Sequence, residues 1–200
     1  MLKIKRFKGG CLESNCYVIS NREKGSCYII DPGYEAGRIV GYVEENSLKA
    51  KGIILTHHHH DHVGAAAKVA GSLGCPVMIS FEDSLKYKGK ADAYIEDGTV
   101  FNLDGEQLRA VRTPGHTLGS VCIISEESKA VFTGDTIFDT DLGRTDFKDG
   151  SEAEMIKSCK TVIDKWPGDY RIYPGHDESA AMKQVRTYNV EFLHCLEAED

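Results

Sequence analysis

The chain has 200 residues, 41% of them hydrophobic and 28% charged, and this composition predicts one globular domain over residues 1–200. Its 24 Lys and Arg residues against 31 Asp and Glu residues give a formal net charge of −7, which disfavours nucleic acid and anionic membrane surfaces as partners. The sequence contains neither the run of roughly 20 apolar residues that a membrane helix needs nor a secretory signal. We therefore expect a cytoplasmic protein.

Short strands are predicted in the first part of the chain. Segments rich in β-forming residues and separated by turn-forming residues lie at 2–7, 16–20 and 26–30. Apolar residues at helical spacing predict a helix over residues 35–46. The apolar run at 52–55 then predicts a buried strand, and the Ala-rich residues 63–73 predict a helix that ends at Gly74.

Strands return in the second half of the chain. They are predicted at residues 99–103, 107–113, 121–125 and 130–134. A helix is expected over 151–165, because Ser151 and Glu154 form a capping-box pattern. A short strand at 171–173 precedes a tail that is predicted to be helical from about Ser179. Two batches of strands with helices between them predict an α/β fold of two sheets covered by helices.

Histidine, rather than cysteine, is the candidate metal ligand of this sequence. The seven cysteines are scattered and form no C-x-x-C pair, so we expect free thiols in a reducing compartment. Of the eight histidines, five fall between His57 and His62, interrupted only by Asp61. This clustering is not explained by composition and predicts a function for the segment.

The segment THHHHDHVG, at residues 56–64, directly follows a predicted strand. In an extended loop His57 and His59 project to the same side, while Asp61 and His62 project differently. One loop therefore offers two pairs of ligands, enough to begin two adjacent metal sites. Imidazole and carboxylate ligands without thiolate suit zinc, iron or manganese. The alternative is a solvated polar loop.

Three further candidate ligands each lie at the end or the start of a predicted strand. His116 lies in TPGHTLGS, Asp135 follows AVFTG, and His176 follows RIYPG. A glycine directly precedes each of them and allows the backbone to approach a site closely. Each residue alone is typical of a turn, but together with the histidine-rich segment they form a set of seven candidate ligands.

These motifs resemble those of the metallo-β-lactamase-fold hydrolases, and within them the short glyoxalase II-like branch. The resemblance rests on the segments IIDPG, THHHHDHVG, TPGHTLGS, FTGD, GRTDF and YPGHD. It implies a four-layer αββα sandwich with metals at one edge of the two sheets. The chain departs from the family after His176, where Asp177 replaces Gly and Asn189-Val190 replaces Asn-Pro. We expect these changes to affect the tail more than the metals.

The resemblance also implies two divalent metal ions, expected to be zinc, with iron or manganese as alternatives. Three histidines would hold the first metal, one aspartate and two histidines the second, and one aspartate would bridge them. In that order these ligands are His57, His59 and His116; Asp61, His62 and His176; and Asp135. His58 and His60 occupy positions that the family leaves variable and are not assigned as ligands.

A metal pair that shares Asp135 would lower the pKa of a bridging water towards about 7, supplying a hydroxide that attacks a carbonyl. Asp135 and Asp61, which would orient this hydroxide, are the predicted catalytic residues. A thiolate leaving group, with a conjugate-acid pKa of roughly 8.5, needs no strong general acid, so a thioester is favoured. The resemblance points to an anionic thioester such as S-lactoylglutathione.

Arg144 is the candidate substrate-binding residue. It falls where the family presents a basic residue towards the anionic glutathione moiety, and a guanidinium can bind a carboxylate through two hydrogen bonds. The alternative is a surface arginine paired with Asp141 or Asp146. The sequence leaves both interpretations open.

Other activities compete with thioester hydrolysis. A persulfide dioxygenase of the same fold also resembles the chain in GRTDF and uses the counterparts of His57, His116 and Asp135 on one iron. Ser120 stands where those dioxygenases tend to have Cys, which favours a hydrolase. A hydrolase acting on another ester or a lactone is a further alternative. A non-catalytic metal module would need a closed coordination shell, which the His/Asp set without Cys argues against.

Overall fold

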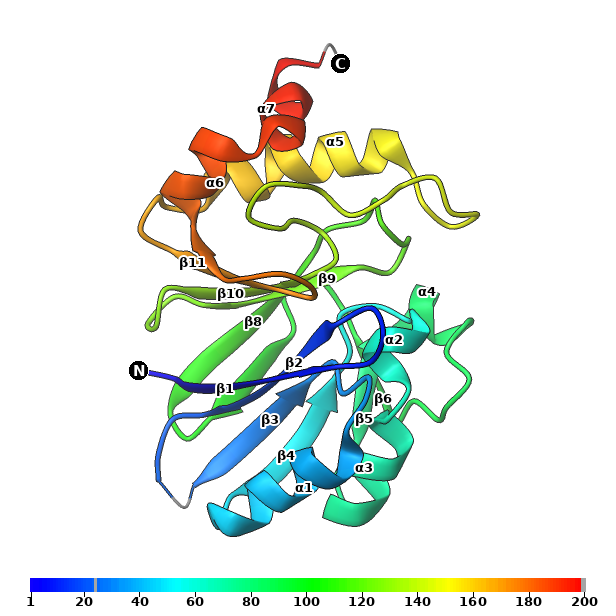
Figure 1. Cartoon of the computed structure of the whole chain (residues 1–200), viewed down its shortest axis with the longest axis vertical. Coiled ribbons are helices and arrows are strands. Elements are labelled where there is room, and N and C mark those ends of the chain that lie inside the picture. Colours follow the sequence, from blue (N-terminus) through cyan, green and yellow to red (C-terminus); the bar gives the residue numbers. More distant parts are fainter. Residues whose placement is uncertain (24, 199–200) are drawn as a thin grey trace.

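The computed structural model describes residues 1–23 and 25–198, and two six-stranded sheets packed face to face form its centre (Figure 1). The first sheet follows the chain order from β1 to β6. Its strands are β1 (Lys3–Gly9), β2 (Ser14–Ser20), β3 (Ser26–Ile30), β4 (Lys49–Ile54), β5 (Val77–Ser80) and β6 (Ala93–Ile95). β1 to β3 pair antiparallel, and β3 to β6 pair parallel.

The second sheet has the order β12-β11-β10-β9-β8-β7. Its strands are β7 (Val100–Leu103), β8 (Glu106–Arg112), β9 (Val121–Ser125), β10 (Ala130–Gly134), β11 (Arg171–Pro174) and β12 (Ala180–Ala181). Only β10 and β11 pair parallel here. The chain between these two strands supplies the crossover that a parallel pair requires.

Helices cover the outer face of each sheet (Figure 1). On the first sheet lie α1 (Ala36–Glu45) and α3 (Ala66–Leu73), and near its edge the one-turn helices α2 (His60–Val63) and α4 (Phe81–Ser84). On the second sheet lie α5 (Glu152–Thr161), the 3₁₀ turn η1 (Ile163–Lys165), α6 (Met182–Tyr188) and α7 (Val190–Glu197). The predicted four-layer αββα sandwich is confirmed.

Three hydrophobic clusters hold these four layers together. In the first, Ile39 of α1 and Val69 of α3 pack against one face of the first sheet. The second lies between the sheets and includes Ile54 and Phe132. In the third, Met155 of α5 and other helical residues pack against the outer face of the second sheet. Each sheet is therefore buried on both faces, so its central strands are continuously apolar.

The predicted elements differ from the structure mainly between residues 75 and 98. Here β5, α4 and β6 are only three or four residues long, too short to show a hydrophobic period in the sequence. The helix predicted over 151–165 ends as an α-helix at Thr161, and the predicted helical tail is broken at Asn189 into α6 and α7. Ser151 caps α5 as expected, by accepting a hydrogen bond from the backbone N–H of Glu154.

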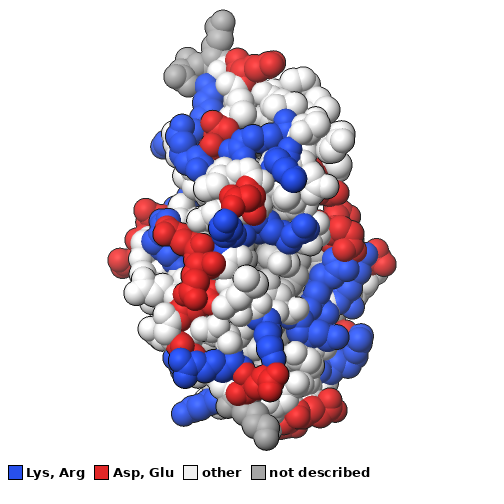
Figure 2. Space-filling view, turned by 90° about the vertical axis from the view of Figure 1, so that its left-hand side faces the viewer, with Lys and Arg blue, Asp and Glu red and all other residues white. Residues whose placement is uncertain are grey.

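Charge is mixed over the surface. Basic and acidic side chains lie next to one another on the face shown in Figure 2, so the net charge of −7 is not gathered there into one acidic patch. None of the helices in the described part of the chain combines the length and apolar character needed to cross a membrane.

Candidate metal centre

The seven predicted ligands converge at one edge of the two sheets. The histidine loop, residues 55–59, leaves the end of β4 and leads into α2. The His116 loop, residues 113–120, connects β8 and β9, while Asp135 and His176 directly follow β10 and β11. Neighbouring strand ends thus bring together residues that are far apart in the sequence.

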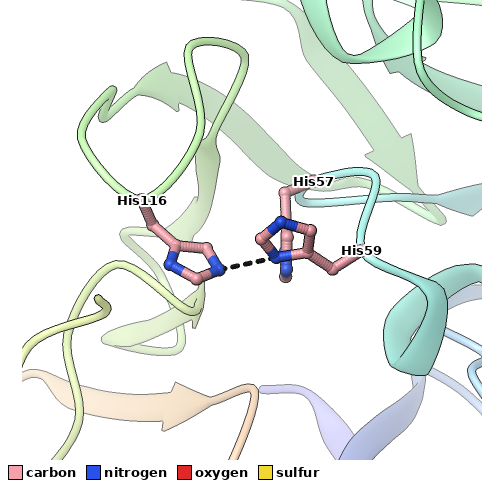
Figure 3. Close-up of side chains that lie close together, drawn as sticks. All are labelled: His57, His59 and His116. Atoms are coloured by element: carbon pink, nitrogen blue, oxygen red, sulfur yellow. Dashed lines mark hydrogen bonds between the residues drawn. The ribbon is translucent and has the colours of Figure 1, made fainter. Parts of the chain in front are cut away.

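The first group consists of His57, His59 and His116. One nitrogen from each ring lies within 4.8 Å of the others, and Nδ1 of His59 is 2.8 Å from Nε2 of His116. Figure 3 shows the three rings directed towards a common point between the histidine loop and the His116 loop. The expected projection of His57 and His59 to one side is therefore present in the structure.

The second group consists of Asp61, His62 and His176. Its ligand atoms also lie within 4.8 Å of one another. Oδ2 of Asp61 is 3.2 Å from Nε2 of His62 and 3.2 Å from Nε2 of His176. The two imidazole nitrogens are 3.3 Å apart, a distance that a shared cation would explain better than a hydrogen bond between two rings.

Asp135 lies between the two groups. Its Oδ2 atom is 3.5 Å from Nε2 of His116 and 3.4 Å from Nε2 of His176. Its Oδ1 atom is 3.3 Å from Nε2 of His62. A single carboxylate therefore contacts ligands of both groups, as a bridging ligand must.

Two buried atoms at this centre test whether the residues fit a metal. Nε2 of His57 and Oδ1 of Asp135 are buried without a hydrogen-bond partner. Leaving a buried group such as Nε2 of His57 unpaired costs roughly 1–3 kcal/mol, and the contact of Oδ1 of Asp135 is with another candidate ligand, His62. A cation coordinated by these atoms would remove that cost, so the donor set fits divalent metal ions.

The ring nitrogens that face away from the centre are anchored. Nδ1 of His57 is 3.1 Å from the Thr56 hydroxyl, and Nδ1 of His116 and of His176 are 2.8 Å and 3.0 Å from backbone carbonyls. Nδ1 of His62 is 3.2 Å from the carboxylate of Asp31. Such outer contacts orient a metal-binding imidazole and select its tautomer.

Asp31 contacts a candidate ligand, a role that the sequence motifs did not predict. It belongs to the segment IIDPG, which contributes to the family resemblance. The available signal was an aspartate directly after a buried apolar strand, followed by Pro-Gly. Because Asp31 is 2% exposed and contacts a candidate ligand, the structure assigns it a positioning role.

Two glycines allow the backbone to pass close to the centre. A Cβ atom on Gly175 would lie 2.2 Å from Oδ1 of Asp135, and one on Gly33 would lie 1.5 Å from the carbonyl oxygen of Asp61. Any larger residue would therefore displace a candidate ligand. The close approach expected beside His176 is present.

Burial and charge shift the pKa values of the ligands in different directions. Burial lowers the pKa of His57 well below its ordinary value and that of His59 to about 4. Burial also acts against a charged His176, but hydrogen bonds to two aspartates raise its pKa to about 9. Despite its burial, Asp135 has a depressed pKa because the charged ring of His62 stabilises the carboxylate. A cation entering the second group would therefore displace protons.

A cleft of about 690 Å³ opens onto the centre. It is lined by His59, His116, His176 and both aspartates of the centre, and its walls are largely apolar. The apolar side chains are Leu12, Phe138, Leu142 and Phe147. Phe147 packs edge-on against the ring of His59, with the ring centroids 5.4 Å apart.

Arg144 lies at the rim of this cleft. Its guanidinium binds the carboxylate of Asp146 through two hydrogen bonds of 2.9 Å and 2.8 Å and lies 4.5 Å from the ring centroid of Phe147. The ion pair with Asp146, one of the two alternatives, is therefore present, and the role of Arg144 in substrate binding stays a prediction.

His58 and His60 differ in their surroundings. His60 is exposed at the cleft. His58 is nearly buried and lies 3.1 Å from Asp83 and 3.1 Å from Asp149. Neither residue belongs to the first or the second group, although His58, His59 and Asp149 also lie close together. The contact between Asp83 and His58 was not predicted from the sequence, because α4, which carries Asp83, was not predicted.

Comparison with known proteins places this centre in a family context. The model of the metallo-beta-lactamase superfamily matches residues 9–186. The chain is 34% identical to the hydroxyacylglutathione hydrolase GloC of Haemophilus influenzae, covering 88% of this chain and 92% of GloC. It is 31% identical to the probable polyketide biosynthesis zinc-dependent hydrolase BaeB of Bacillus velezensis, over 80% and 72% of the two chains.

A solved structure shares the whole architecture. The di-iron-bound form of TTHA1623 superimposes with a TM-score of 0.82 at 25% identity, over 93% of this chain and 98% of that chain.

Proposed function

The chain belongs to the metallo-beta-lactamase superfamily and is a metal-dependent hydrolase of that fold, and we propose that it cleaves thioesters such as S-lactoylglutathione. The fold binds divalent metals, and the His/Asp groups described above would hold them. The observation that carries the proposal is the position of Asp135, whose carboxylate contacts ligands of both groups. This arrangement suits a pair of cations, which we propose to be zinc.

We infer two ion sites from the two groups of ligands. His57, His59 and His116 would hold one ion, Asp61, His62 and His176 the other, and Asp135 both. Bound metals of this kind supply Lewis-acid polarisation of a carbonyl and activation of water at neutral pH. We assign to Asp61, which belongs to the second group and lines the cleft, the role of orienting the attacking water.

The described residues that line the cleft supply no hydroxyl or thiol nucleophile. Among the described residues that line it there is no serine, threonine or cysteine. Water is therefore the nucleophile that the site favours. The apolar wall of Leu12, Phe138, Leu142 and Phe147 displaces bulk water around a bound acyl group, which strengthens electrostatic interactions with the reacting carbonyl.

Three further considerations support an anionic thioester as the substrate. An amide nitrogen generally needs protonation before it leaves, whereas a thiolate leaves unprotonated, so a thioester makes the smaller demand on the side chains of the cleft. Arg144 supports an anionic substrate, because its ion pair with Asp146 is exposed and therefore weak, and can be exchanged for a substrate carboxylate. The resemblance to GloC supports a hydroxyacylglutathione substrate.

Metal analysis combined with hydrolysis of S-lactoylglutathione tests the proposal. We expect two metal ions per chain and release of glutathione at a rate that falls when the metals are removed. One iron per chain, with sulfite formed from glutathione persulfide and oxygen and no thioester hydrolysis, would show instead that the chain is a persulfide dioxygenase. Hydrolysis of a lactone or an oxygen ester alone would reject the thioester.

A further inference from the structure

The His58 side chain lies between α4 and the loop that follows Leu142. This side chain is 11% exposed, and its two ring nitrogens face two different carboxylates. Nδ1 lies 3.1 Å from Oδ2 of Asp83, and Nε2 lies 3.1 Å from Oδ2 of Asp149. The imidazole therefore spans a gap between α4 and the cleft loop, defined here as residues 143–150.

Asp83 joins the histidine loop to the His116 loop. Its Oδ2 atom accepts hydrogen bonds from the backbone N–H of His58 at 2.9 Å and from the hydroxyl of Thr117 at 2.8 Å. Its Oδ1 atom accepts one from the backbone N–H of Gly119 at 2.8 Å. Asp83 is only 2% exposed, so these contacts are shielded from water and contribute more than surface contacts do.

Asp149, in the cleft loop, is the second carboxylate that His58 contacts. Besides His58, it contacts Nζ of Lys86 at 2.9 Å. The cleft loop has no regular secondary structure, and it carries both Arg144 and Phe147. The backbone oxygen of Arg144 anchors Nδ1 of His116. The position of this loop therefore affects the wall of the cleft and one candidate metal ligand together.

We propose that Asp83, His58 and Asp149 form a clamp that positions the cleft loop against the metal-binding histidines. The clamp acts through other residues, because none of its three side chains lines the cleft. A displacement of about 1 Å in such a supporting contact is enough to impair a site. The role is independent of which substrate the enzyme cleaves.

Limited proteolysis of the native chain tests the clamp. The cleft loop contains two exposed trypsin sites, after Arg144 and after Lys148, and cleavage of a native loop reports how often it opens. We expect His58→Ala and Asp149→Ala each to accelerate cleavage at these two bonds by about fivefold. The double variant should be cleaved no faster than either single variant, because both remove the same connection.

Three matched variants separate the clamp from other effects. Asp149→Glu keeps a carboxylate within reach of His58 and should be cleaved more slowly than Asp149→Ala. Lys86→Met removes the other partner of Asp149, on a side chain that is 45% exposed, and should change cleavage much less than His58→Ala does. Asp169→Ala removes an exposed carboxylate paired with Lys129 and should have no effect on the loop.

Melting temperature and cleavage at sites outside the loop should stay at wild-type values in His58→Ala, because a positioning role is local. Unchanged loop cleavage in His58→Ala and Asp149→Ala would overturn the proposal. So would additive acceleration in the double variant, or a Lys86→Met variant that opens the loop as much as His58→Ala.

Discussion

Oδ2 of Asp31 lies 3.2 Å from Nδ1 of His62, although the two residues are 31 positions apart in the chain. The same oxygen accepts a hydrogen bond of 2.6 Å from the Thr56 hydroxyl, which in turn lies 3.1 Å from Nδ1 of His57. One buried carboxylate thus orients a histidine of each ligand group.

Replacement of Asp31 by Asn should weaken metal binding without removing a ligand. The amide nitrogen would replace either Oδ2, which contacts both the Thr56 hydroxyl and the His62 ring, or Oδ1, which accepts a hydrogen bond from the backbone N–H of Thr56, so at least one contact is lost. Outer contacts of this kind are worth about 10- to 100-fold in metal affinity, and we expect a loss of that size in a competition titration with a chromophoric chelator. Asp104→Asn is the control, because Asp104 accepts a backbone hydrogen bond from Ser26 away from the centre. Equal affinity of Asp31→Asn and wild type would refute the role.

Asp135→Ala should lose metal and activity together. Its carboxylate contacts His116, His176 and His62, so its removal opens both ligand groups at once. Elemental analysis of the purified variant should find less than one tightly bound ion per chain, and hydrolysis should fall by more than 100-fold. Full activity with two retained metals would show that Asp135 bridges nothing.

Gly175→Ala should disturb the centre by steric contact. The added methyl group would lie 2.2 Å from Oδ1 of Asp135 and 2.6 Å from Cε1 of His62. We expect metal affinity to fall at least about tenfold. Gly41→Ala, in α1, is the matched control, since a Cβ there meets nothing within 4 Å. In a helix, alanine is more stable than glycine by about 1 kcal/mol. This control should bind metal normally and melt at or above the wild-type temperature.

Arg144→Ala should select against anionic thioesters. The variant loses a charge-assisted hydrogen bond to the substrate carboxylate, although part of the benefit of that bond is offset in the wild type by giving up the pair with Asp146. We expect kcat/KM for S-lactoylglutathione to fall about tenfold, through KM, with little change for an uncharged thioester. Asp146→Asn should act in the opposite direction by freeing the guanidinium. Equal losses on both substrates would mean that Arg144 contributes to structure only.

Asn189→Ala should destabilise the fold. The fully buried side chain accepts a hydrogen bond from the N–H of Phe192, capping α7, and donates to the carbonyls of Phe138 and Asp141. Loss of the cap and of the buried bonds should lower the free energy of unfolding by about 2–4 kcal/mol, measured by urea denaturation. Asn46→Ala, which removes one exposed bond to Tyr42, should cost about 0.5 kcal/mol or less.

Local patterns in the sequence predict the two sheets, the helices that cover them and the candidate ligands. Apolar strands and amphipathic helices are local periodic patterns, and the segment THHHHDHVG predicts a site within nine consecutive residues. The family resemblance supplied the division of the seven residues into two groups, which the structure reproduces as two clusters with Asp135 between them.

The residues that orient those ligands could be identified from the three-dimensional structure but not from the sequence. The contacts of Asp31 with Thr56, of His58 with Asp83 and of Arg144 with Phe147 depend on the relative positions of loops. Such contacts have no period, and most join residues distant in the chain, so no local pattern encodes them. α4, which carries Asp83, is a single turn positioned by the strands around it, because a helix of that length is not stable on its own.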